Sequence, residues 1–176
     1  MKKIVSICLA LSMILSLSLC AFADYEPGVE PAEIEEVAID VSLEDAISGV
    51  SRSLSKPTEF WDLSRRNYSG RLDVVGIDRL YSNYYFSPNA NNKINVTYRI
   101  YSDTGRATKM VVGLYDITDN RQTSAKWTSN GATREGITES FNFINLNPEH
   151  HYAITFQAVF DGISRDTVHG TATIRH

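Results

Sequence analysis

The clearest structural pattern in this chain is KINVTYRIY, at residues 93–101, where apolar and polar side chains alternate. Ile94, Val96, Tyr98 and Ile100 fall on one side of this pattern, and Tyr101 falls on the other with the polar residues. A period of two places successive side chains on opposite faces of a β-strand. The stretch therefore predicts a strand with one buried face.

The same alternation recurs along the C-terminal part of the chain. Residues 152–160 place Tyr152, Ile154, Phe156 and Ala158 on one face, and 165–174 repeat the pattern more weakly. Further strands are predicted at 71–75, 80–86, 109–116, 123–128 and 139–144, with the core candidates Val112, Leu114, Phe141 and Phe143. Short strands between turns rich in Gly, Pro and Asn, with no long helix among them, predict an antiparallel β-sandwich.

Residues 143–158, FINLNPEHHYAITFQA, resemble the corner between two strands in fibronectin type III-like and Ig-like domains. The family pattern is Leu-x-Pro followed by a Tyr that begins a long alternating strand, here Leu146, Pro148 and Tyr152. The resemblance implies a tyrosine corner, in which the Tyr152 hydroxyl bonds a backbone group near Leu146–Pro148. The strand at 93–101 lacks the tryptophan usual in this family, so a jelly roll or another Ig-like sandwich stays open.

The N-terminus has the features of a secretory signal peptide. Lys2 and Lys3 precede an apolar run that reaches Cys20, and Ala21-Phe22-Ala23 supplies small residues for cleavage. We expect residues 1–23 to be removed after Ala23, leaving a secreted or periplasmic chain without cysteine and without stable membrane insertion. The competing interpretation is lipidation at Cys20, although the bulky Leu19 before it does not suit that processing.

Three segments follow the predicted signal peptide. Residues 24–41 are acidic and contain Pro27 and Pro31, which predicts a disordered leader. Residues 42–57 predict a short amphipathic helix, because Ser42 is a suitable N-cap and apolar residues follow at helical spacing. Residues 58–176 are the predicted β-sandwich domain. The chain shows no clustered basic stripe, so we expect no nucleic-acid partner.

No motif identifies an active site. The chain has no Gly-x-Ser-x-Gly elbow, no His-Glu-x-x-His and no phosphate-binding glycine loop. Acidic side chains at Glu135, Glu139, Asp161 and Asp166 could meet in space, yet nothing local marks a catalytic pair. We therefore expect no enzyme activity and no cofactor, with a small hydrolase as the remote alternative.

No metal site is expected either. Adjacent His150 and His151 should point to opposite sides of a strand, which does not suit chelation of one ion. Oxygen-bearing side chains occur together from Asp116 to Asn120, but Asp119-Asn120 is better interpreted as a two-residue hairpin turn than as a calcium loop. That turn pairs Val112 with Trp127 and points Trp127 toward the core.

Tyrosines supply the candidate binding residues. Tyr115 and Tyr101, taken as neighbours on adjacent strands, would form an exposed aromatic face that could stack on a sugar ring or contact a protein. The leading hypothesis is a non-catalytic extracellular recognition module that binds a glycan or a surface protein. The alternative is an assembly protein that acts through self-association or a protein partner, and the oligomeric state is left open.

Overall fold

The structure is a computed structural model, and it describes residues 32–36, 54–75, 78–106, 108–159 and 166–176. The chain divides into two compact units, Met1–Glu30 and Pro31–His176, and all described residues belong to the second. The predicted signal peptide and the predicted helix over 42–57, apart from its last four residues, lie outside the described residues. The strands are β1 (Glu33–Glu36), β2 (Glu59–Phe60), β3 (Tyr68–Val75), β4 (Leu80–Tyr81), β5 (Tyr84–Tyr85), β6 (Ile94–Ser102), β7 (Lys109–Asp116), β8 (Arg121–Thr128), β9 (Ile137–Ile144), β10 (Tyr152–Val159) and β11 (Thr167–Arg175).

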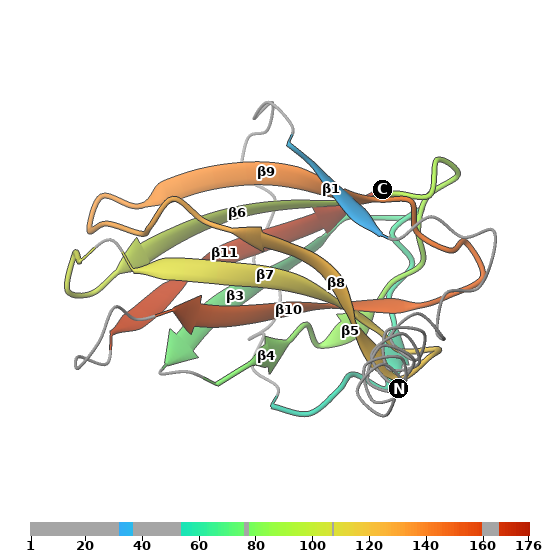
Figure 1. The fold of residues 1–176 in the computed structure, drawn as a ribbon, viewed down its shortest axis with the longest axis horizontal. Helices are drawn as coiled ribbons and strands as arrows, with labels where there is room; N and C mark the ends of the chain where they lie inside the picture. Colours follow the sequence, from blue (N-terminus) through green and yellow to red (C-terminus); the bar gives the residue numbers. More distant parts are fainter. Residues whose placement is uncertain (1–31, 37–53, 76–77, 107, 160–165) are drawn as a thin grey trace, which may run out of the picture. The chain divides into compact units, whose positions relative to one another are not determined.

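Two antiparallel sheets form a sandwich-like, all-β fold (Figure 1). The five-stranded sheet has the order β1-β9-β6-β11-β3, and the four-stranded sheet has the order β4-β10-β7-β8. β2 and β5 form a short parallel pair beside them. From β6 onward the chain changes sheet at every connection except the β7–β8 hairpin. Strands that follow one another in the sequence therefore mostly lie in different sheets.

The core lies between the two sheets and consists of the inward-facing half of each strand. Every core candidate is buried: Ile94, Val96, Tyr98, Ile100, Val112, Leu114, Phe141, Phe143, Ile154, Phe156 and Ala158. Trp127 points inward from β8, and its ring stacks on Phe141 with centroids 5.1 Å apart. The alternation decides this arrangement, because a shift of one residue would turn every one of these side chains to the outer face.

The connection from β9 to β10 is a tyrosine corner. Tyr152 is buried, and its hydroxyl accepts a hydrogen bond from the backbone N–H of Asn147 at 3.1 Å. Leu146 is buried beside it, while Pro148 is exposed on the turn. The hydrogen bond fastens the segment that carries the chain from one sheet to the other.

The prediction of a disordered leader is wrong for four residues. Glu33–Glu36 form β1, which pairs with the outer edge of β9, and Ile34 packs against the core. Glu35 makes an ion pair with Lys93 at 2.7 Å and accepts a hydrogen bond from Asn142. The backbone N–H and C=O groups of an unpaired sheet edge can hydrogen-bond to any extended segment. Here the edge of β9 pairs with residues 33–36 of the predicted leader.

The β7–β8 hairpin also differs from the prediction. Val112 pairs with Trp127 as expected, but Tyr115 pairs with Gln122, so β8 carries two extra residues in a bulge. The turn consequently spans four residues, 117–120, instead of two. The side chains of Gln122 and Thr123 both donate hydrogen bonds to the Leu114 carbonyl, at 2.7 and 2.9 Å. These two side chains supply hydrogen-bond donors to the Leu114 carbonyl at the point where the bulge interrupts the backbone hydrogen bonds between β7 and β8.

Candidate functional site

The two tyrosines proposed from the sequence do not form one surface. Tyr101 lies on β6 in the five-stranded sheet, whereas Tyr115 lies on β7 in the four-stranded sheet. Tyr115 is only 6% exposed, because the ring of Tyr81 packs edge-on against it and the Lys56 ammonium lies 4.6 Å from its ring centroid. The prediction of a shared platform is wrong, since it treated two strands in different sheets as neighbours.

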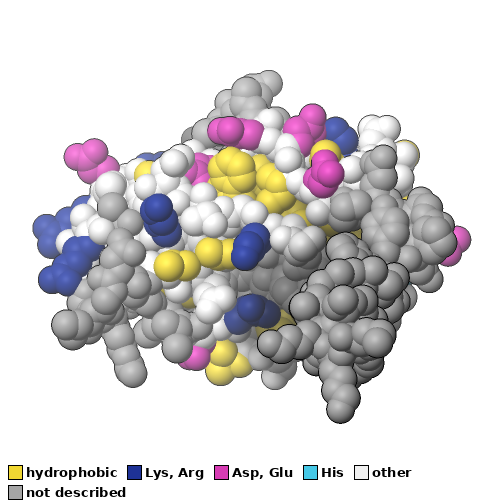
Figure 2. Space-filling view, in the orientation of Figure 1, with side chains coloured by type: hydrophobic (Ala, Val, Ile, Leu, Met, Phe, Trp, Pro, Cys, Tyr) yellow, Lys and Arg dark blue, Asp and Glu magenta, His cyan; other side chains and the backbone are white. Residues whose placement is uncertain are grey.

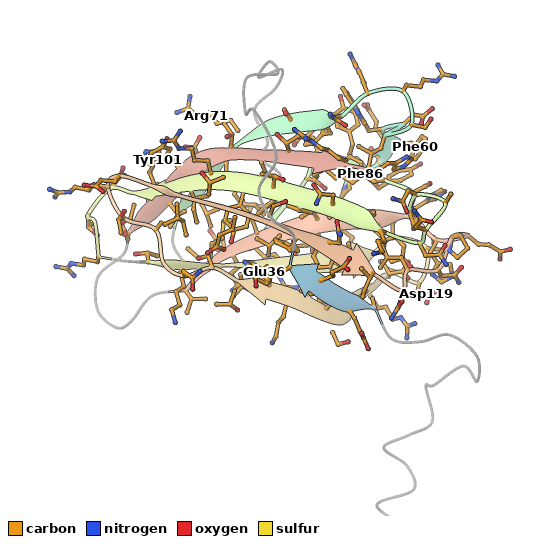
Figure 3. All side chains as sticks on the ribbon, turned by 90° about the horizontal axis from the view of Figure 1, so that it is seen from above. Glu36, Phe60, Arg71, Phe86, Tyr101 and Asp119 are labelled. Carbon is orange, nitrogen blue, oxygen red and sulfur yellow. The ribbon has the colours of Figure 1, made fainter. Side chains whose placement is uncertain are left out.

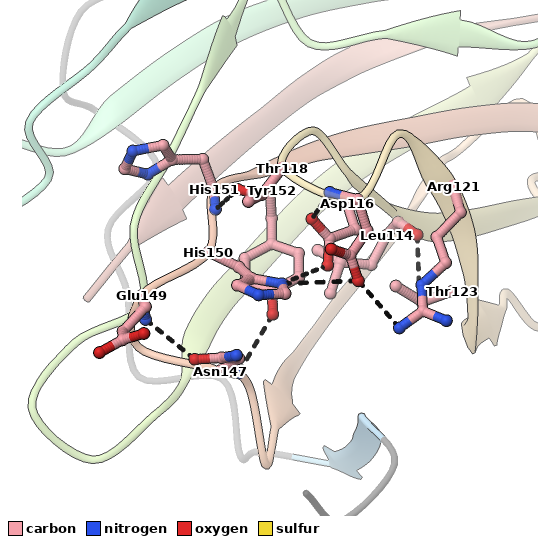
Figure 4. Close-up of polar contacts among 11 residues, drawn as sticks. Leu114, Asp116, Thr118, Arg121, Thr123, Asn147, Glu149, His150, His151 and Tyr152 are labelled. Atoms are coloured by element: carbon pink, nitrogen blue, oxygen red, sulfur yellow. Dashed lines mark hydrogen bonds and ion pairs between the residues drawn. The ribbon is translucent and has the colours of Figure 1, made fainter. Parts of the chain in front are cut away.

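His150 and His151 separate two clusters at one end of the sandwich. As the strand geometry predicts, their side chains turn to opposite sides of the β9–β10 corner (Figure 4). His150 points toward acidic groups of the β7–β8 turn. His151 instead lies among aromatic rings, and its backbone N–H donates to the Thr118 hydroxyl at 3.0 Å.

The first cluster contains Asp116, Asp119 and His150, each of which places one potential metal-ligating atom within 4.8 Å of the others. His150 Nδ1 lies 2.8 Å from Asp116 and 3.9 Å from Asp119. The second oxygen of the buried Asp116 accepts the backbone N–H of Asp119 at 3.0 Å, and Arg121 pairs with Asp119 at 3.0 Å (Figure 4). Protein groups thus already satisfy each member of the cluster.

The second cluster is aromatic, and we call Phe60, Tyr85 and His151 the aromatic corner. The Phe60 centroid lies 5.6 Å from that of Tyr85 and 5.7 Å from that of His151, and the last two are 5.2 Å apart. Phe60 is 46% exposed, an unusual exposure for a phenylalanine. Figure 3 shows it at the same end of the molecule as Asp119.

Further rings support the aromatic corner from behind. Trp61 contacts Tyr68 and Tyr84, and Tyr68 contacts the fully buried Phe86, which belongs to the core. The Trp61 backbone N–H donates to the Tyr85 carbonyl at 3.0 Å. This chain of contacts connects the exposed ring of Phe60, through its neighbour in sequence, to the rigid interior.

Sequence reasoning missed the aromatic corner. It gave neither Phe60 nor Tyr85 a role. Phe60 has no alternating neighbours, because β2 is two residues long. The one available signal was the presence of Phe60 and Trp61 shortly after the predicted helix, which ends at Pro57.

Two of the carboxylates considered for catalysis are engaged in buried hydrogen bonds. Glu139 accepts hydrogen bonds from Tyr98, Trp127 and Asn130. Asp166 accepts them from Ser102 and Thr108, both at 2.5 Å, and from backbone amides. Burial alone would raise the pKa of Asp166, but these hydrogen bonds outweigh it and lower the pKa to about 2. Glu135 is exposed, and Asp161 lies outside the described residues.

The outer surface of the described part is mixed in character. In the face shown in Figure 2, hydrophobic side chains form separate small groups among acidic and basic side chains. Over the residues that the structure describes, no helix has the length and apolar character needed to cross a membrane.

Comparison with known proteins assigns the chain to no family. No protein-family model matches the sequence, and no curated protein matches it. Among solved structures, the chain is similar to a carbohydrate-binding module, CBM36, in complex with calcium and xylotriose. The two are 16% identical with a TM-score of 0.38, over 61% of this chain and 87% of that chain. A likeness of this size is too low to support an argument about function.

Proposed function

We propose that this protein is a secreted, non-catalytic recognition module whose aromatic corner binds a glycan. The observation that carries the proposal is the exposed ring of Phe60, supported on one side by Tyr85 and His151. The signal-peptide pattern at residues 1–23 supports an extracellular location. A fibronectin type III-like or Ig-like relationship remains part of the same proposal, supported by the tyrosine corner at Tyr152.

An aromatic ring suits a sugar because the C–H groups on one face of a pyranose pack against a flat apolar surface. Such a ring must be exposed on one face and held still on the other, so that little side-chain entropy is lost on binding. Phe60 meets the first condition through its exposure, and its contacts with Tyr85 and His151 meet the second. Hydroxyl groups of a sugar would find polar partners close by, since the Ser87 hydroxyl lies 3.0 Å from His151 Nδ1.

The proposal is tested by retention of the purified protein on insoluble cellulose, chitin, xylan and peptidoglycan. We expect retention on at least one matrix, and Phe60→Ala should weaken it by about tenfold or more, as loss of an aromatic anchor does. Val159→Ala is the matched control, because it shortens another exposed hydrophobic side chain, at the far end of β10 from His151.

Two results would overturn the proposal. One is the absence of retention on every matrix. The other is equal loss in Phe60→Ala and Val159→Ala, which would place the binding surface elsewhere. Thermal unfolding of each variant checks that the fold is intact, and a small effect is expected because Phe60 is exposed.

A further inference from the structure

The outer face of the five-stranded sheet carries rows of side chains that cross its strands. The strand register places Arg71, Thr171, Arg99 and Thr138 in one row, from β3 across β11 and β6 to β9. The next row contains Asp73, His169 and Tyr101. Figure 3 shows Arg71 and Tyr101 close together on this side, far from Phe60. We call Arg71, Arg99, Thr171, Tyr101 and His169 the arginine face.

Two arginines flank Thr171 within this face. Each is one strand away from Thr171, so their Cα atoms are about 10 Å apart at the usual strand spacing. Arg99 is exposed and makes no ion pair with any other described residue. The Arg71 side chain is 61% exposed, and Asp73 is 3.5 Å from its Nε. Both guanidinium groups are therefore accessible to a ligand.

An aromatic ring lies directly beside these charges. The Tyr101 ring stacks on the His169 imidazole with centroids 5.8 Å apart and an interplanar angle of 20°. The Arg99 guanidinium lies 5.3 Å from the Tyr101 centroid, and an Asp103 carboxylate oxygen lies 3.0 Å from His169 Nδ1. On the other side, Gly136 leaves room for the ring, since a Cβ there would lie 2.6 Å from it. Tyr101 is thus held in place next to a free guanidinium.

We propose that the arginine face binds an acidic polysaccharide, with uronate carboxylates on Arg99 and Arg71 and a sugar ring against Tyr101. A guanidinium group binds a carboxylate through two parallel hydrogen bonds, which a neutral sugar cannot accept in the same way. Tyr101 adds an apolar surface for one face of a sugar ring. A polyanion that exposes no sugar ring would not use this contact. This second surface is independent of the aromatic corner.

The charge on this face favours a polymer with moderately spaced negative groups. Asp73 lies beside Arg71 and Asp103 lies beside His169, and both carboxylates would repel a densely charged chain. Nucleic-acid binding typically needs a continuous basic stripe that neutralises many phosphates. Here the whole chain carries a formal charge of −4, and two arginines are the accessible cations of the row.

The test is affinity electrophoresis of the purified protein in gels with polygalacturonate or with its methyl ester. The ester has the same sugar backbone but lacks the carboxylate charge. We expect retardation by polygalacturonate that falls about tenfold or more in Arg99→Gln and in Tyr101→Ala. Arg99→Lys should be intermediate, because lysine keeps the charge without the forked geometry. Arg121→Gln, which changes an exposed arginine on the other sheet, should migrate like the parent protein.

Three outcomes would overturn the proposal: no retardation, equal retardation by the methyl ester, or equal loss in Arg99→Gln and Arg121→Gln. Competition by duplex DNA as strong as that by polygalacturonate would also overturn it in favour of nonspecific polyanion binding. The retention assay with Phe60→Ala tests the aromatic corner separately, so failure here leaves the proposed function of the aromatic corner untouched, and the reverse also holds.

Discussion

The indole N–H of Trp127 donates a hydrogen bond to the Glu139 carboxylate at 2.7 Å, and it joins the two sheets through the core. The same carboxylate accepts the Tyr98 hydroxyl and both the backbone and side-chain amides of Asn130. Burial, with Glu139 as the next contribution, raises the pKa of Tyr98 well above its usual value. A buried carboxylate is tolerated in this core because its hydrogen bonds are satisfied.

Removing this carboxylate should destabilise the fold strongly. Glu139→Ala leaves the donors of Tyr98, Trp127 and Asn130 without their acceptor, and we expect a loss of about 2–4 kcal/mol in the free energy of unfolding. Glu139→Gln should cost less, since the amide retains one acceptor oxygen. Urea unfolding measures both. The control is Glu135→Ala, an exposed position that should change stability by less than about 0.5 kcal/mol. Equal effects at the two positions would contradict the account.

The tyrosine corner predicts a loss of stability in alkaline solution. Burial raises the pKa of Tyr152 to about 12, and Asp116 and Asp119 add to this, although the hydrogen bond from Asn147 opposes it. The native state therefore binds more protons than the unfolded chain between about pH 10 and 12, and stability falls as pH rises through this range.

The variant Tyr152→Phe tests this linkage. It removes a tyrosine with a raised pKa, so the slope of unfolding free energy against pH should become shallower by about 1.4 kcal/mol per pH unit. At neutral pH it should cost about 0.5–1.5 kcal/mol, the typical net contribution of one hydrogen bond. A slope identical to that of the parent protein between pH 10 and 12 would refute the assignment to Tyr152.

Asp166 predicts the opposite dependence in acid. Its pKa of about 2 lies below the ordinary value of 3.8, so its contribution to stability is complete above about pH 4 and is lost as pH falls toward 2. We expect Asp166→Asn to be less stable at pH 7 and to lack this part of the acid transition. Thr108→Val, which removes one hydroxyl donor, should raise the pKa of Asp166 and shift the transition upward. Urea unfolding between pH 2 and 5 provides the measurement, and unchanged acid profiles in both variants would disprove the role of Asp166.

For the cluster of Asp116, Asp119 and His150, we expect protein contacts to be sufficient without an ion. Millimolar Ca²⁺ or Zn²⁺ and excess EDTA should each leave the thermal midpoint unchanged. His150→Ala should lower stability by about 1–3 kcal/mol, because it leaves the buried Asp116 without its ring partner. His176→Ala, at an exposed position, is the control. A midpoint that rises by several degrees with either metal in the parent protein, and not in Asp119→Ala, would instead establish a metal site.

The aromatic corner and the arginine face show which parts of a candidate binding site a local sequence pattern can predict. Tyr101 was selected from the sequence as an outward-facing residue, and it does face outward. His169 comes from β11, which pairs with β6, and Arg71 comes from β3, which pairs with β11. No local pattern predicts either pairing. Phe60 and His151 are distant in the sequence and meet because β2 pairs with β5 and Phe86 bridges to Tyr152. Pairing between strands that are distant in the sequence therefore brings the residues of both sites together.

The sequence by itself determined where the long strands lie and, along β6 and β10, which face is buried. Alternation along KINVTYRIY and along 152–160 is a local property, because a side chain's direction depends only on its position within the pleat. Only the tertiary structure decided which strands share a sheet, and it therefore separated Tyr101 from Tyr115 and covered Tyr115 with Tyr81 and Lys56. It also recruited Glu33–Glu36 to the edge of β9, because backbone pairing accepts an acidic segment that could not form a core of its own.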